Sequence, residues 1–440
     1  MANKQGFVRG MAITMGSRLI ALVIGLGASA VLARALGPEG KGMYALAVLL
    51  PSMIVALGSF GLDSATIYYT AREEISWRII LGNNVVLSFV QGFLGILAGF
   101  IIVRVFHENL FKDIAISILN FSLVLIPINF FFHSVRYILW GAQRVKEFNQ
   151  VILIQRGIFF ILSVVVLWAF NMGVIGAIGA TFISILAAAV LAFHWAKMIS
   201  GGVVLSLNPV YIRKAFTYGF QAYLANILGF LNYRADMFLV NWLMGPAAAG
   251  LYGTGVDIIE RGWLISQVAG AMIFPRVAAA KNSRTKLLLT PLVARTVFWI
   301  TAGGVVVLVF ISDWLVYFLY SEAFLPAARA LRGLAIGVIS LSVGRVLSND
   351  IAGRGRPVFN IYVGLATIVV NVILNFLWIP RYGIEGAAWA SSVSYTISFL
   401  GALYFYCRLS GNHWTMIIFP QKEDLVIYYK TMVKILPFAK

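Results

Sequence analysis

A duplicated pattern of glycine, proline and small residues constrains this chain more than any other feature. The segment that begins at Gly37-Pro38 recurs about 208 residues later at Gly245-Pro246, and in both copies a glycine and a tyrosine follow at the same spacing. A second series recurs in the same way: Gly173, Gly176, Ala177, Ala180 and Ser184 match Gly383, Gly386, Ala387, Ala390 and Ser394. We infer that one half-protein was doubled, an arrangement from which many transporters build two similar lobes.

Composition places both halves in a membrane. Hydrophobic residues make up 61% of the chain and charged residues only 11%, whereas about a quarter of the residues of soluble domains are charged. A spanning helix needs about 20 mostly apolar residues. Such runs lie near 11–36, 43–71, 79–106, 114–140, 149–171, 174–197, 215–245, 247–275, 288–320, 327–350, 357–379 and 383–408. The predicted fold is therefore an all-α integral membrane protein, with twelve transmembrane helices in two parallel six-helix repeats.

The predicted organisation has four parts. An N-terminal six-helix lobe covers 1–199, a cytoplasmic linker 200–213, a C-terminal six-helix lobe 214–408 and a cytoplasmic or interfacial tail 409–440. The tail mixes aromatic residues with lysines, which suits the membrane interface. The first apolar run is too long for the hydrophobic core of a cleaved signal peptide.

The net charge of +18 is explained by the distribution of basic residues. Most of the 34 lysines and arginines fall at the predicted cytoplasmic ends of the helices. This asymmetry follows the positive-inside rule and places both termini in the cytoplasm. Binding of nucleic acid is therefore not needed to explain the charge.

Residues that would carry metal chemistry or catalysis are scattered. The one cysteine and the four histidines, His107, His133, His194 and His413, lie on different segments without ligand spacing. We expect no metal site, and histidines that are packed or interfacial. The sequence also shows no nucleophile paired with a base, so we expect a transporter and not an enzyme.

Ionisable residues within the predicted spans are the candidates for function, because a charge at the centre of a membrane helix costs about 2.5–3.5 kcal/mol. One group lies near the predicted midplane of the seventh and eighth spans: Arg234, Asp236, Asp257, Glu260 and Arg261. The last three share one face of a helix. We favour lining of a central cleft, since a staple of this many charges gains little over apolar packing. The alternative is ion pairing that locks the two helices together.

A second group lies closer to the predicted cytoplasmic side. It consists of Arg18, Asp63, Arg156 and Arg345. If these side chains face the cleft, its inner half is mostly cationic. In the alternative, the three arginines extend along their stems to the interface.

Five segments rich in glycine, proline and small residues follow one another along nearly the whole chain. They are Val31 to Tyr44, Gly61 to Ala65, Arg234-Ala235-Asp236 leading into Gly245-Pro246 and Gly250-Leu251-Tyr252, Gly353 to Pro357 with Asn360, and Tyr382 to Ala388. In this order and spacing they resemble the helix signatures of the polysaccharide-exporting lipid-linked oligosaccharide flippases, or O-antigen flippases. That family lies within the multidrug/oligosaccharidyl-lipid/polysaccharide exporter superfamily.

The resemblance implies a V-shaped pair of six-helix lobes in the bacterial cytoplasmic (inner) membrane. Such a protein turns a polyprenyl-diphosphate-linked sugar, the undecaprenyl-diphosphate repeat unit of a surface polysaccharide, from the inner to the outer leaflet by alternating access. Helices one, two, seven and eight would line its cleft, where Arg18 and Arg261 would attract the diphosphate. Asp236, Asp257 or Glu260 could carry the H+ or Na+ that resets the cleft. Membrane lipid and a polysaccharide polymerase complex are the other partners implied.

Two other functions stay open on the sequence. A cation-coupled multidrug exporter of the same superfamily would favour acidic over basic residues in the cleft. A membrane glycosyltransferase or ligase is disfavoured by the short outer loops and by the two-fold repetition.

Overall fold

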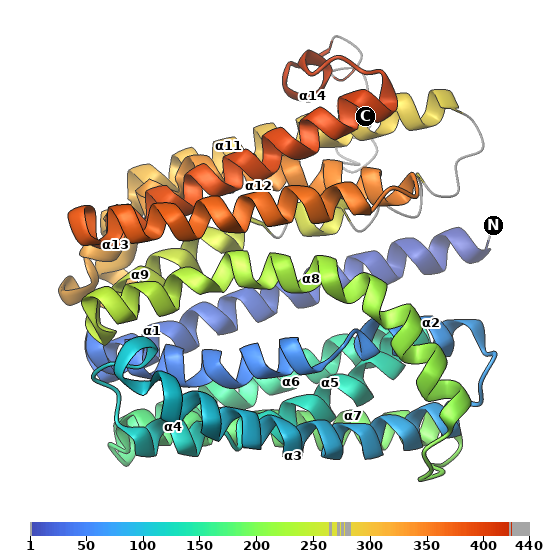
Figure 1. The fold of residues 1–440 in the computed structure, drawn as a ribbon, viewed down its shortest axis with the longest axis horizontal. Helices are drawn as coiled ribbons and strands as arrows, with labels where there is room; N and C mark the ends of the chain where they lie inside the picture. Colours follow the sequence, from blue (N-terminus) through green and yellow to red (C-terminus); the bar gives the residue numbers. More distant parts are fainter. Residues whose placement is uncertain are drawn as a thin grey trace, which may run out of the picture. The chain divides into compact units, whose positions relative to one another are not determined.

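In a computed structural model of the chain, the structure describes residues 2–263, 266–270, 273, 277, 283–421 and 424. The regular elements among these residues are all helical (Figure 1). Long apolar runs fold this way because, in hydrocarbon, each backbone N–H and C=O must find a partner within its own segment. The prediction of an all-helical chain is confirmed for the described residues.

Eight helical stretches of the described residues are long and apolar enough to cross a membrane. They are Gly16–Gly58, Trp77–Leu110, Ile116–Gly141, Val145–Ala169, Gly173–Ser200, Leu288–Tyr320, Glu322–Gly353 and Val358–Ser410. The first and the last of these stretches lie in α1 (Ala2–Gly58) and α13 (Val358–Ser410), each of which contains one non-helical glycine.

The glycines that open the repeated patterns share an unusual backbone conformation. Gly37 within α1 has φ 66° and Gly383 within α13 has φ 61°. Gly245 has φ 84° between α8 (Pro209–Met244) and α9 (Pro246–Ile259), and Gly173 has φ 58° at the start of α7 (Gly173–Ser200). Positive φ strongly favours glycine. Both members of each sequence pair therefore serve as a sharp turn between helical segments.

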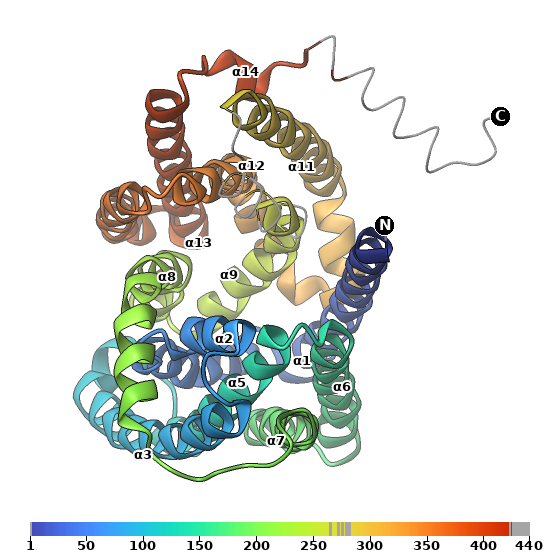
Figure 2. The ribbon, with the colours of Figure 1, turned by 90° about the vertical axis from the view of Figure 1, so that its right-hand side faces the viewer.

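The chain forms two compact units, one of residues 1–254 and 314–327, the other of residues 255–313 and 328–440. In the first unit, α1 packs on α6 (Val145–Val164) and α7, and α3 (Trp77–Leu110) packs on α5 (Leu125–Gly141), as the view in Figure 2 lets the reader follow. This unit also holds α4 (Ile116–Ser122), the π-helical turn η1 (Val165–Ala169) and the 3-10 turn η3 (Glu322–Phe324). The predicted lobe boundary at 199–214 stays a prediction.

The second predicted span, 43–71, is not one continuous helix. α1 ends at Gly58 and α2 (Leu62–Arg72) begins after a break in which Phe60 and Gly61 have φ 46° and 77°. A Cβ atom on Gly61 would lie 2.0 Å from the carbonyl oxygen of Gly219 on α8. Apolar composition does not encode two consecutive left-handed residues, which is why the break was not predicted.

The second unit is built from η2 (Glu260–Trp263), most of α11 (Ser283–Tyr320), α12 (Pro326–Gly353), α13 and α14 (Thr415–Ile418). Its tail is held by an ion pair in which Arg295 of α11 donates to both carboxylate oxygens of Asp424, at 2.7 and 2.6 Å. Burial raises the pKa of Asp424, but the hydrogen bonds from Arg295 and from the Gln421 backbone amide, together with the charge of Arg295, outweigh burial and leave that pKa below its usual value.

Candidate functional site: a polar pocket in the first unit

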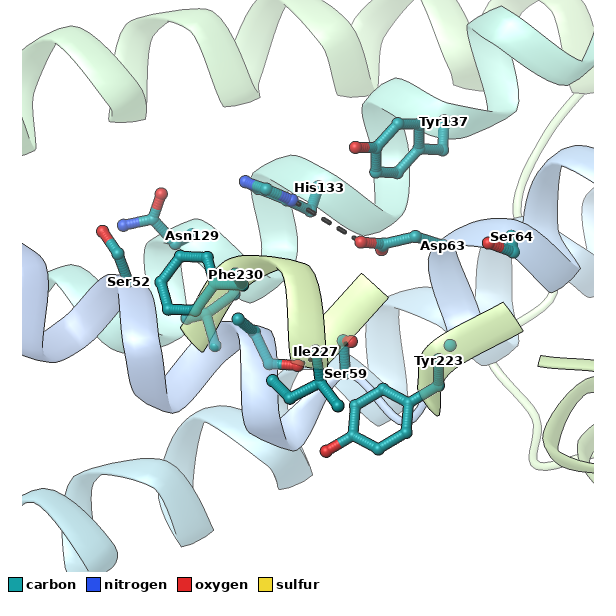
Figure 3. A pocket seen from close by; sticks show the side chains of 13 residues that line it. Ser52, Ser59, Asp63, Ser64, Asn129, His133, Tyr137, Tyr223, Ile227 and Phe230 are labelled. Carbon is teal, nitrogen blue, oxygen red and sulfur yellow. Dashed lines mark hydrogen bonds and ion pairs between the residues drawn. The ribbon is translucent and has the colours of Figure 1, made fainter. Parts of the chain in front are cut away.

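A pocket of about 330 Å³ lies in the first unit among α1, α2, α5 and α8 (Figure 3). It is lined by Ser52, Val55, Ala56, Ser59, Gly61, Asp63, Ser64, Asn129, His133, Tyr137, Tyr223, Ile227 and Phe230. Hydroxyl and amide groups therefore share the pocket with aromatic rings, inside a unit whose helices are otherwise strongly apolar.

The lining follows from helical periodicity. Asn129, His133 and Tyr137 stand four residues apart on α5, so they project from one face of that helix. Tyr223, Ile227 and Phe230 share one face of α8, and Ser52, Val55 and Ala56 share one face of α1, with Ser59 just after the end of that helix. Sequence reasoning that counted only charged residues missed these stripes, although the four-residue spacing of polar side chains on α5 is visible in the sequence.

The break between α1 and α2 forms one wall of the pocket. It leaves carbonyl groups at the end of α1 without helical partners, and side chains from other helices bond to them. The hydroxyl of Tyr223 donates to the carbonyl of Leu57 at 2.7 Å, and the amide of Gln91 donates to that of Gly58 at 2.7 Å. The break also places Asp63 in the first turn of α2, where the helix dipole favours a negative charge.

Asp63 and His133 face each other across the pocket (Figure 3). The His133 Nδ1 atom lies 3.7 Å from the Asp63 Oδ2 atom, and each side chain is 32% exposed. Among the described residues that line the pocket, none is lysine or arginine. The arrangement can hydrogen-bond a hydroxyl-rich molecule and present rings to its apolar faces.

Among the nine predicted site residues, Asp63 lines this pocket. Arg156 of α6 is exposed and donates from Nη1 to the carbonyl of Ala21 on α1 at 3.1 Å. Arg18 is half-buried on α1. A cationic inner cleft built on these arginines stays a prediction.

The predicted midplane cluster is divided between the units. On α8 of the first unit, Arg234 is half-buried, whereas Asp236 is 1% exposed and accepts hydrogen bonds from the Met237 amide at 2.8 Å and from the Tyr252 hydroxyl. The other three residues of the cluster belong to the second unit: Asp257, Glu260 and Arg261.

In the second unit, Asp257 is exposed near the end of α9. Glu260 and Arg261 open the 3-10 turn η2, so the α-helix expected over 247–275 ends at Ile259. The Arg345 guanidinium lies 4.2 Å from the centre of the Trp263 ring. That the charged residues of both units line one cleft stays a prediction.

Sequence reasoning also missed Lys41, which stands between two glycines in a segment predicted to be a turn. Its side chain is buried on α1, and its Nζ atom donates to the hydroxyls of Ser29 at 3.1 Å and Thr254 at 2.8 Å. The same ammonium lies 4.4 Å from the ring centre of Tyr320.

Among the described residues, no group of three or more His, Cys, Asp and Glu side chains is placed to hold a metal ion.

The model of the polysaccharide biosynthesis protein family matches residues 31–329 of this chain. Curated relatives include the capsular polysaccharide biosynthesis protein CapF of Staphylococcus aureus, with 21% identity over 84% of this chain and 92% of that protein. The probable low-salt glycan biosynthesis flippase Agl15 of Haloferax volcanii is 23% identical over 83% of this chain and 76% of its own length. A putative O-antigen transporter of Shigella flexneri is 23% identical over 86% and 92%.

Two solved structures show the fold. The lipid II flippase MurJ in an inward closed conformation superposes with a TM-score of 0.72 at 16% identity, covering 96% of this chain and 98% of that one. An inward-facing MATE family transporter of the MOP superfamily gives a TM-score of 0.69 at 16% identity, covering 91% and 98%. The apolar helices make the chain a multi-pass membrane protein, and the two solved structures show that it has the fold of the multidrug/oligosaccharidyl-lipid/polysaccharide exporter superfamily. Because the family model matches more than half of its length, the chain belongs to the polysaccharide biosynthesis protein family.

Proposed function

We propose that this protein is a flippase that moves undecaprenyl-diphosphate-linked oligosaccharide repeat units from the inner to the outer leaflet by alternating access, for surface polysaccharide assembly. The observation that carries the proposal is the pocket, in which serine hydroxyls and the Asn129 amide lie beside Tyr137, Tyr223 and Phe230. Sugars offer many hydroxyls for hydrogen bonding and apolar C–H faces that pack on rings. A purely structural seam between membrane helices would use small residues to bring the helices close together, and would not keep a cavity between them.

The relatives support transport of a glycan on a lipid. Two of them carry the words flippase and O-antigen transporter in their names, and MurJ, which shares the fold, is a lipid II flippase. A protein of this kind moves its cargo without changing a covalent bond. The proposal therefore gives the pocket a binding role and not a catalytic one.

The proposal includes twelve spans in two six-helix repeats, with both termini in the cytoplasm. The repeated glycines support the duplication, since Gly37 and Gly245 both adopt positive φ, as do Gly173 and Gly383. The excess of lysine and arginine at one predicted side supports the orientation.

The energetics also belong to the proposal. The cytoplasm is electrically negative, so the potential helps to expel an anionic diphosphate by about 2.3 kcal/mol per unit charge at 100 mV. Arg18 and Arg261 are our candidates for attracting the diphosphate. Asp236, Asp257 and Glu260 are the candidates for carrying the H+ or Na+ that resets the protein.

A cation-coupled multidrug exporter is the second candidate function. One observation favours it: the pocket holds the Asp63 carboxylate and, among its described lining residues, no lysine or arginine. Such a lining would attract a cationic drug.

Reconstitution in vesicles separates the two functions. A polyprenyl-diphosphate disaccharide labelled with a fluorophore is placed in both leaflets, and its movement is followed by a quencher that reaches only the outside. We expect the wild-type protein to move this lipid and to leave cationic dyes where they are. Asn129→Leu keeps the branched shape of the side chain but removes the amide, so it should slow movement about tenfold, which corresponds to about 1.4 kcal/mol. Phe121→Leu, on the exposed side of α4, is the control.

Dye efflux without lipid movement would assign the drug exporter function instead. Equal rates for Asn129→Leu and Phe121→Leu would remove the pocket from the transport path.

A further inference from the structure

The charge of the pocket is set by two facing side chains. Asp63 and His133 are the only aspartate, glutamate, lysine, arginine or histidine side chains among the described residues that line it. The Nδ1 atom of His133 lies 3.7 Å from the Oδ2 atom of Asp63, so this one imidazole can at most balance the charge of the carboxylate. The two side chains therefore bring no surplus positive charge with which to hold a second anion.

Two arginines on these helices, Arg136 and Arg72, do not line the pocket itself, although Arg136 contacts the ring of Tyr137, which does. Arg136 of α5 lies over the rings of Phe132, Tyr137 and Phe148, with its Cζ atom 4.8, 5.0 and 5.5 Å from their centres. Arg72, at the far end of α2, is paired with Glu74 at 2.9 Å. Neither guanidinium is among the groups that line the pocket.

We infer that this pocket is the sugar subsite of the proposed flippase and that it selects glycans whose bound sugar carries no carboxylate. The inference rests on the proposed function. A uronic acid would bring a second carboxylate within a few ångströms of Asp63, with at most one imidazole to balance both anions. Like charges at such a distance repel, and near a protein surface they repel more strongly than in bulk water. The diphosphate, which is more anionic still, binds outside this pocket.

A neutral or amino sugar meets no such penalty. Its hydroxyl or ammonium groups can donate to Asp63, and its remaining hydroxyls can bond to Ser59 and Asn129, which line the same pocket. Asp63 follows the break at Gly61, where the backbone contact with Gly219 is too close for any residue larger than glycine. Selection against acidic sugars is thus built into the helix break.

Two labelled lipids that differ in a single group test the inference. They are polyprenyl-diphosphate glucose and polyprenyl-diphosphate glucuronic acid, with the same polyprenyl chain and fluorophore, in vesicles without a membrane potential. We expect wild-type protein to move the glucose lipid at least about tenfold faster. Asp63→Asn should bring the ratio of the two rates close to one, mainly by raising the glucuronate rate. Glu108→Gln removes a carboxylate whose side chain is 95% exposed, outside the pocket, and should keep the wild-type ratio.

His133→Gln provides a second variant in case Asp63→Asn does not fold. It removes the one basic side chain among the described residues that line the pocket, so the ratio should move further in favour of glucose. Equal rates for both lipids in the wild type, or an unchanged ratio in either variant, would overturn the selectivity while leaving the flippase function intact. Movement of neither lipid by folded wild-type protein would instead refute the proposed function.

Discussion

At the scale of single residues, the burial and the hydrogen-bond partners of a charged side chain distinguish a residue that lines a pocket from one that supports helix packing. Asp236 and Asp63 look alike in the sequence, as carboxylates within predicted spans. In the structure Asp63 opens onto a pocket with its side chain 32% exposed, whereas Asp236 is 1% exposed and accepts from a backbone amide and from Tyr252. A buried carboxylate is costly unless its oxygens are hydrogen-bonded. Beside its candidate role as a carrier of H+ or Na+, we therefore expect Asp236 to support the packing of α8 on α9.

Tyr252→Phe tests that expectation, because it removes only the hydroxyl that donates to Asp236. Loss of a donor to a buried charged group should lower the free energy of unfolding by about 1–3 kcal/mol. The measurement is the melting temperature of the detergent-solubilised protein. Tyr362→Phe, at a ring that is 56% exposed on α13, should change it little. If Tyr252→Phe instead abolishes lipid movement at unchanged melting temperature, Asp236 belongs to the transport path.

Sequence reasoning could find Asp63 but not its surroundings. A charge inside an apolar run is conspicuous, so Asp63 was a candidate from composition alone. His133 was expected to be packed or interfacial, and the neutral residues Asn129 and Tyr137 were passed over. Their common face is evident only when polar residues are followed at helical spacing. Lys41 was missed for a different reason: its partners Ser29, Thr254 and Tyr320 come from distant parts of the chain.

At the scale of helices, the repeated glycines mark a close and reciprocal crossing. A Cβ atom on Gly42 of α1 would lie 1.8 Å from the carbonyl oxygen of Pro246, and one on Gly250 of α9 would lie 2.0 Å from that of Pro38. Each glycine thus faces the turn that begins the other copy of the repeat. Only glycine lets the two backbones approach so closely.

Gly42→Ala and Gly250→Ala should each destabilise the protein, because backbone and not a flexible side chain stands in the way of the new methyl group. We expect a loss of about 1–3 kcal/mol, the usual cost of overpacking, measured as a lower melting temperature on size-exclusion chromatography after heating. Gly179→Ala is the matched control on α7, since a Cβ atom there meets nothing within 4 Å. It should be neutral or stabilising by up to about 1 kcal/mol. Equal melting temperatures for Gly42→Ala and Gly179→Ala would show that the crossing is loose.

At the scale of the whole molecule, helix positions were predictable where the bilayer sets them. The apolar runs 79–106 and 174–197 correspond to α3 (Trp77–Leu110) and α7 (Gly173–Ser200), because length and composition alone define a span. The break at Phe60-Gly61 and the 3-10 turn at Glu260 depend on backbone geometry and tertiary contacts, which hydropathy does not report. Within the part of the chain that the structure describes, eight stretches meet the criteria for a span by themselves, and the predicted twelve require that α1 and α13 each cross twice and that α8 and α9 cross as well.

Membrane topology follows from that count and can be mapped by labelling single cysteines in a Cys407→Ser background. With both termini inside, the exposed positions Asp113 and Glu322 lie in outer turns, whereas Lys146 and Arg356 lie in cytoplasmic ones. A membrane-impermeant maleimide should therefore label Asp113→Cys and Glu322→Cys in intact cells, but Lys146→Cys and Arg356→Cys only after permeabilisation. A pair of crossings brings the chain back to the side on which it started. The pair within α1 and the pair formed by α8 and α9 therefore do not change the side on which these four sites lie, and the four sites report the orientation of the protein. Met172→Cys and Ala247→Cys, at exposed neighbours of the two turn glycines, extend the map before α7 and between α8 and α9, and both should react from outside. Labelling of Ala247→Cys only from inside would remove the crossing by α8 and with it the two six-helix repeats.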